Sequence, residues 1–97
     1  MLSMQGLVYA DKKDHLNAYN SYKRAATFAP KSGGAWVGYG KAAYDLHKYQ
    51  ESLDAFKKAC KIDSHAVKDF REVAGRLHKE KNNEWQYKFT DALSSCN

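Results

Sequence analysis

Four histidines are the residues of this chain best suited to metal binding or acid–base chemistry: His15, His47, His65 and His78. A metal site would need such residues at short spacing, as in His-Glu-x-x-His or in Cys/His clusters, and no such spacing occurs. The sequence also has no glycine-rich phosphate loop and no Gly-x-Ser-x-Gly turn. We therefore predict a protein that is not an enzyme, with no catalytic residue, no bound metal and no cofactor.

The two cysteines, Cys60 and Cys96, offer a second kind of chemistry. They form no Cys-x-x-Cys pair, and small domains held together by disulfides usually carry cysteine at higher density. The sequence therefore predicts two reduced thiols, one packed on the small-residue side of a helix and one near the end of the chain. On the same argument we expect a cytoplasmic location.

The net charge of +5 in 97 residues raises nucleic acid as a partner. Acidic residues are interleaved with basic ones along the whole chain, however, so the surplus is not gathered into one stripe. An RNA-binding helical-repeat protein is thus the alternative interpretation, and nucleic acid is not the favoured partner. No run approaches the roughly 18 consecutive apolar residues of a transmembrane helix, and the first residues lack the features of a signal peptide, so no membrane partner is predicted.

The secondary structure that positions these residues follows from a sequence repeat with a spacing of 34 residues. Gly6 matches Gly40, Tyr22 matches Phe56, Ala25 matches Ala59 and Phe28 matches Ile62. A period of this length is typical of a repeat built from two helices. Apolar periodicity and turn residues such as Pro30, Gly33 and Gly34 divide the chain further. We expect helices at about 1–12, 15–28, 34–47, 50–62, 67–81 and 84–95.

The segment 35–63, AWVGYGKAAYDLHKYQESLDAFKKACKID, carries Trp36, Gly40, Phe56 and Ala59 at the positions of a known pattern, and it resembles the tetratricopeptide repeat family. The resemblance implies one all-α domain over 1–97, an α-solenoid of three antiparallel helix pairs in a right-handed superhelix. The repeats would span about 1–30, 31–64 and, in degenerate form, 65–97. The second half of the third copy fits the pattern only if one residue is omitted near Asn82 and Asn83.

The resemblance also implies a function, because the first helix of each pair lines a concave groove that binds peptides in this family. The residues that map onto this lining are Ser3, Leu7, Ala10 and Asp11, then Val37, Lys41, Tyr44 and Asp45, then Lys68, Arg71, Gly75, His78 and Lys79. The candidate partner-binding residues are Lys41, Tyr44, Asp45, Lys68, Arg71, His78 and Lys79. The expected partner is a protein or peptide segment, and the chain would act as an adaptor or assembly scaffold. Since the groove becomes basic toward its C-terminal half, an acidic or C-terminal carboxylate ligand would suit it.

The N-terminal edge of this array carries an unusual number of apolar residues, namely Met1, Leu2, Met4, Leu7 and Val8. They cannot all lie on the one face that packs against the second helix. We expect this edge to be covered either by further repeats upstream or by self-association.

Overall fold

The computed structural model describes residues 12–96, and every regular element in that range is an α-helix. The helices are α2 (Lys12–Phe28), α3 (Gly33–Asp45), α4 (Tyr49–Ile62), α5 (Ala66–Lys79) and α6 (Asn83–Cys96). The expected all-α helical-repeat architecture is confirmed, and each of these helices lies within three residues of its predicted range. The expected first helix, with the groove residues Ser3 to Asp11 and the apolar edge, lies outside the described residues.

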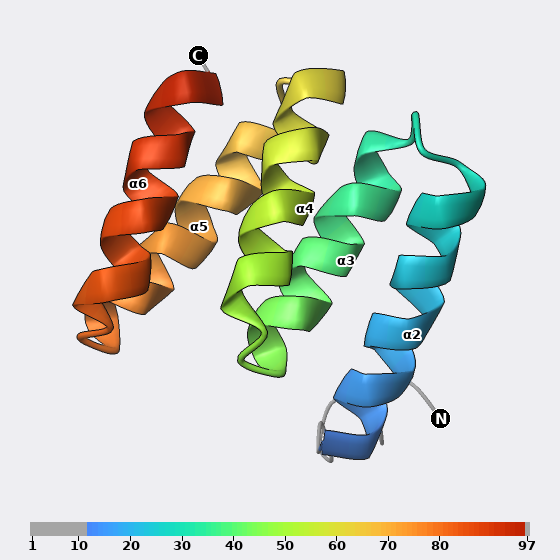
Figure 1. Ribbon diagram of the computed structural model, residues 1–97, viewed down its shortest axis with the longest axis horizontal. Coiled ribbons are helices and arrows are strands. Elements are labelled where there is room, and N and C mark those ends of the chain that lie inside the picture. Colours follow the sequence, from blue (N-terminus) through green and yellow to red (C-terminus); the bar gives the residue numbers. More distant parts are fainter. Residues whose placement is uncertain (1–11, 97) are drawn as a thin grey trace.

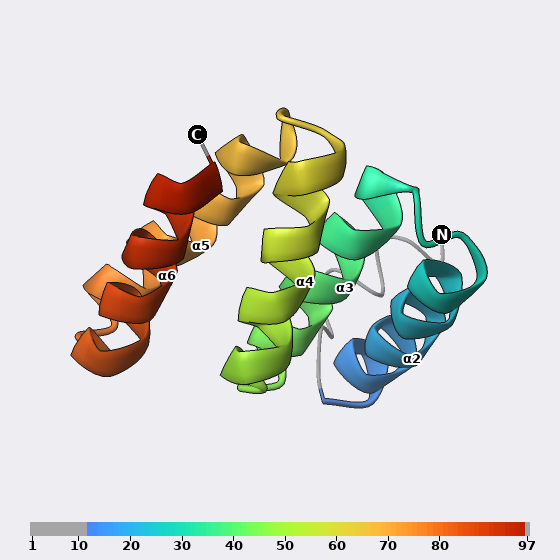
Figure 2. The ribbon, with the colours of Figure 1, turned by 45° about the horizontal axis from the view of Figure 1, so that its top comes forward.

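The helices lie in a row in which consecutive helices run in opposite directions (Figure 1). Helix α2 stands at one end of this row, the α3/α4 pair in the middle and the α5/α6 pair at the other end (Figures 1 and 2). Each pair contacts its neighbour, since α3 and α4 both pack against α5, and α4 also packs against α6. The core between the two pairs is therefore continuous.

The turns inside the two complete pairs repeat each other 34 positions apart. His47 and Lys81 both adopt the left-handed conformation, with φ of 61° and 60°. The following amide then bonds back to the preceding helix in both turns, from Lys48 to the carbonyl of Ala43 (2.8 Å) and from Asn82 to that of Leu77 (3.0 Å). The third repeat thus keeps the full spacing, and the predicted omission of one residue near Asn82 is wrong.

Without that omission, Thr90 rather than Phe89 is the counterpart of Phe56. Phe89 is completely buried one position earlier on α6 and packs edge-on against both Phe56 and Phe70, with ring centroids 6.5 and 5.7 Å away. Phe56 and Phe70 stack on each other at 5.2 Å. The buried aromatic side chain of α6 therefore stands one position earlier than that of α4, and the exposed Thr90 occupies the position that matches Phe56.

Helices α3 and α4 approach each other closely at Gly40. A Cβ atom added there would lie 2.8 Å from the ring of Phe56, closer than real contacts allow. The buried hydroxyl of Ser52 donates a hydrogen bond to the Gly40 carbonyl over 2.7 Å, which satisfies a polar group that would otherwise be costly inside the core.

A disulfide between Cys60 and Cys96 joins α4 to the last turn of α6, across a sequence separation of 36 residues. The prediction of two reduced thiols is therefore wrong. Sequence spacing alone does not show that the two helices bring these residues together, with their Cα atoms 5.9 Å apart. The cytoplasmic location, which rested partly on free thiols, stays a prediction.

Candidate partner-binding site

One exposed face of α5 carries most of the basic residues that the sequence assigns to the groove. Lys68, Arg71, His78 and Lys79, which we call the basic strip, recur at helical spacing and are all exposed. Among residues 12–96, no carboxylate forms an ion pair with any of the four. The strip therefore offers positive charge that the described part of the chain does not neutralise.

Two of the candidate residues on α3 differ, because each already contacts a partner side chain on another helix. Lys41 Nζ lies 2.9 Å from Asp69 Oδ1 on α5, and Asp45 Oδ2 lies 3.5 Å from His15 Nδ1 on α2. The Lys41–Asp69 pair connects the first helices of two successive helix pairs. Lys41 and Asp45 thus contribute to the fit between neighbouring helices, and the charge of Lys41 is balanced by that of Asp69.

Tyr44 is part of the core, with only 7% of its surface exposed. Its hydroxyl donates a hydrogen bond to the carboxylate of Glu80, just past the end of α5. Burial, together with this hydrogen bond, raises the pKa of the Tyr44 hydroxyl above its ordinary value. The little of Tyr44 that is exposed lines a cavity of about 120 Å³ between α3 and α5.

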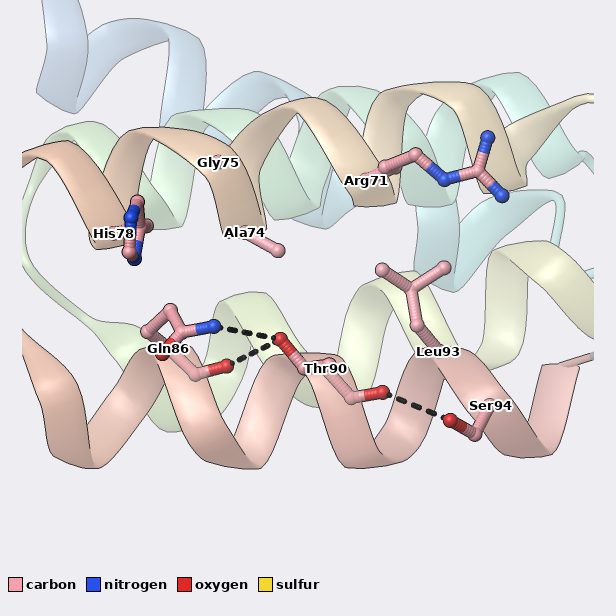
Figure 3. Close-up of a pocket in the computed structure, with 8 residues that line it drawn as sticks. All are labelled: Arg71, Ala74, Gly75, His78, Gln86, Thr90, Leu93 and Ser94. Carbon is pink, nitrogen blue, oxygen red and sulfur yellow. Dashed lines mark hydrogen bonds between the residues drawn. The ribbon is translucent and has the colours of Figure 1, made fainter.

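A larger cavity of about 450 Å³ lies between α5 and α6 (Figure 3). We call it the α5–α6 pocket, and its lining residues are Arg71, Ala74, Gly75, His78, Gln86, Thr90, Leu93 and Ser94. Ala74 and Leu93 are buried and form an apolar floor, while Arg71 and His78 provide nitrogen donors from the α5 side. No acidic residue lines this pocket.

On the α6 side of the α5–α6 pocket, the polar side chains form hydrogen bonds within their own helix (Figure 3). The Thr90 hydroxyl donates to the Gln86 carbonyl over 2.8 Å and accepts from the Gln86 side-chain amide over 3.0 Å. The Ser94 hydroxyl donates to the Thr90 carbonyl over 3.3 Å. Since both hydroxyl protons are used inside the helix, this wall presents mainly acceptor oxygens, whereas the α5 wall presents donors.

The structure thus divides the predicted site residues into three groups. Lys41, Tyr44 and Asp45 line the smaller cavity, together with Glu72, Val73 and Arg76, and Arg71 and His78 line the α5–α6 pocket. Lys68 and Lys79 lie outside both. The sequence interpretation did not include the α6 residues of the larger pocket, namely Gln86, Thr90, Leu93 and Ser94. Strict application of the 34-residue spacing would have found them, because they are the counterparts of Ser52, Phe56, Ala59 and Cys60.

Within residues 12–96, no helix combines the length and the apolar character needed to cross a membrane. The helices that carry the candidate site range from 13 to 14 residues. Their apolar residues face one another across the core.

Comparison with known proteins agrees with this geometry. Family models described as tetratricopeptide repeat match residues 1–32 and residues 33–66. A TPR repeat-containing protein of Schizosaccharomyces pombe is 30% identical over 77 residues, which is 79% of this chain but only 9% of that relative. Such repeats generally mediate protein–protein interaction and are typically parts of non-enzymatic scaffolds. The two successive family matches and the repeated helix pairs show that this chain belongs to the tetratricopeptide repeat family.

Proposed function

We propose that the chain is an interaction module that binds an acidic segment of a partner protein on the concave face formed by α3 and α5. The observation that carries this proposal is the basic strip, because Lys68, Arg71, His78 and Lys79 are exposed on one face with no acidic partner among residues 12–96. Elsewhere on the surface, Lys41, Arg76 and Lys88 each lie within 4 Å of a carboxylate. An acidic ligand would supply the same complement to the strip.

The helices provide a surface that is already formed before the partner arrives. The α3/α5 contact is fixed by the Lys41–Asp69 ion pair and by the Tyr44 hydrogen bond to Glu80. A binding surface that does not need to be ordered loses less conformational entropy on association. The same rigidity suits an adaptor that presents one fixed face to an extended or helical partner segment.

Charge reversal tests the proposal. The variant Lys68→Glu/Arg71→Glu/Lys79→Glu should bind a synthetic extended glutamate-rich peptide at least about tenfold more weakly, with a difference that shrinks at high salt. The matched control is Lys31→Glu/Lys57→Glu/Lys61→Glu, which reverses three exposed lysines outside α5. Equal weakening by both variants would indicate a general charge effect, and binding of oligouridylate in preference to the peptide would favour RNA instead.

A further inference from the structure

We infer that the α5–α6 pocket binds an acidic helix of the partner protein, packed across α5 and α6 in the way that α5 packs across α3 and α4. The inference rests on the proposed function, because it specifies the shape of the partner segment and the place where it binds. It adds residues of α6 that no groove position includes.

The geometry of the two helix pairs is the first support. The α3/α4 turn and the α5/α6 turn have the same left-handed residue and the same closing hydrogen bond, 34 positions apart. Gly75, His78, Thr90 and Ser94 in the pocket are the counterparts of Lys41, Tyr44, Phe56 and Cys60. The pocket is therefore the same part of a helix pair, one repeat later.

Those counterparts are the residues that hold the next pair in place. Lys41 pairs with Asp69, Tyr44 with Glu80, and Phe56 stacks on Phe70, and these three contacts fix α5 and its C-terminal end. Cys60 is bonded to Cys96 of α6. The equivalent surface on the α3/α4 pair thus receives a helix, and no helix of residues 12–96 covers the same surface at the α5–α6 pocket.

The side chains of the pocket indicate what kind of helix it would take. Gly75 and Thr90 are smaller than their counterparts Lys41 and Phe56, and a Cβ atom added at Gly75 would meet nothing within 4 Å. The bound helix would therefore fill this space with larger side chains, apolar ones toward Leu93. Arg71 and His78, seven positions apart on either side of Gly75, call for carboxylates, as Asp69 of α5 supplies to Lys41.

The charges argue against a second copy of the chain as the occupant. The pocket is lined by Arg71 and by no acidic residue, and the whole chain carries a net charge of +5. A second copy would therefore bring surplus positive charge toward this wall, and like charges placed together in an interface are unfavourable. An acidic helix from another protein has no such conflict.

The test uses the whole chain with its disulfide intact and a synthetic helical peptide as the probe. The peptide carries glutamates seven positions apart with leucines between them on the same face, and a lactam bridge on its outer face keeps it helical. Its partner peptide has glutamine in place of each glutamate. We expect the glutamate peptide to bind at least about fivefold more tightly at low salt, with the difference reduced at high salt.

Two pairs of variants locate the binding. Thr90→Glu should weaken binding of the glutamate peptide by at least about tenfold. Thr27→Glu is the matched control, because Thr27 is also an exposed helical threonine whose hydroxyl donates to the carbonyl four residues earlier. This control should bind the peptide as the wild type does. Gly75→Leu should block the pocket without lowering the melting temperature, because the added side chain enters open space. Gly34→Leu, at another glycine with open surroundings, should leave binding unchanged.

Other outcomes overturn the inference. Equal affinity for the glutamate and glutamine peptides would show that the site does not select an acidic helix. Wild-type affinity in both Thr90→Glu and Gly75→Leu would show that the peptide does not bind in the α5–α6 pocket. Dimerisation that Thr90→Glu abolishes would assign it to a second copy, and displacement of the peptide by oligouridylate would assign it to nucleic acid. If the extended peptide binds through Lys68 and Lys79 but the helical peptide does not bind, the groove remains and the helix site is wrong. If neither peptide binds, both proposals fail.

Discussion

Tyr39 on α3 donates its hydroxyl proton to Oε1 of Glu51 on α4 over 2.6 Å. Tyr19 on α2 donates to the same oxygen, also over 2.6 Å. Burial acts to raise the pKa of Glu51, but the two hydrogen bonds and the charges of Lys23 and Lys48 outweigh it, so this pKa lies below its ordinary value. One ionised carboxylate therefore connects three helices.

Replacement of Glu51 by alanine should destabilise the protein more than loss of an ordinary surface carboxylate. Two partly buried hydroxyls would lose their acceptor, which costs about 1 to 3 kcal/mol in the free energy of unfolding. Glu84→Ala is the control, because Glu84 is exposed and, within residues 12–96, its ion-pair partner is Lys88 on the same helix, a contact worth about 0.5 kcal/mol. Urea denaturation measures both, and equal midpoints would contradict the role of Glu51.

Stability should also decrease in alkaline solution. Burial, and then hydrogen bonds to carboxylates, raise the pKa of Tyr19, Tyr39 and Tyr44 above 10.0 in the folded state. The folded state then keeps protons that the unfolded chain releases, so this stabilisation is complete below pH 10.0 and is lost as the pH rises further. Above pH 10.0, the urea midpoint should fall less steeply with pH in Tyr44→Phe than in the wild type. Identical pH dependence in the two proteins would contradict this expectation.

The glycines of two successive repeats should respond oppositely to the same substitution. Gly40→Ala places a methyl group against the ring of Phe56 and should cost about 1 to 3 kcal/mol of unfolding free energy. Gly75→Ala enters open space in the middle of α5 and should stabilise by about 1 kcal/mol, because alanine is the better helix former. If chemical denaturation showed that both changes destabilise the protein, the space beside Gly75 would not be open.

The helical repeat was predictable because Gly40, Phe56 and Ala59 fulfil local requirements of helix packing that recur at a fixed spacing. The alignment of the third repeat was wrong because Phe89 lies one residue before the position where the pattern expects an aromatic side chain. The sequence alone does not show this shift. It follows from the turn at Lys81, which has the same conformation as the turn at His47.

Of the candidate site, the exposed charges of α5 could be read from the sequence, but their partners could not. Lys41 and Asp69 are brought together by the packing of α3 against α5, and their spacing in the sequence does not predict this ion pair. The sequence assigns Tyr44 to the groove, but it packs in the core and donates a hydrogen bond to Glu80, a residue 36 positions later.

The disulfide provides a further prediction. The chain-entropy argument gives a closed loop of 36 residues a stabilisation of about 4 kcal/mol, so Cys60→Ser should lower the unfolding free energy by about this amount. Treatment of the wild type with dithiothreitol should have the same effect, and it should add nothing in Cys60→Ser. Rapid alkylation of both thiols in the untreated native protein, with a denaturation curve insensitive to reductant, would contradict the bond.

The same bond changes how the molecule carries mechanical load. A pulling force applied at the two ends of residues 12–96 reaches Cys96 and passes directly to Cys60, so it bypasses α5 and the rest of α6. The α5–α6 pair is thus covalently shielded from tension, and the first helices to extend lie between Lys12 and Cys60. Reduction would place the whole row of helices in series and lengthen the chain released on stretching.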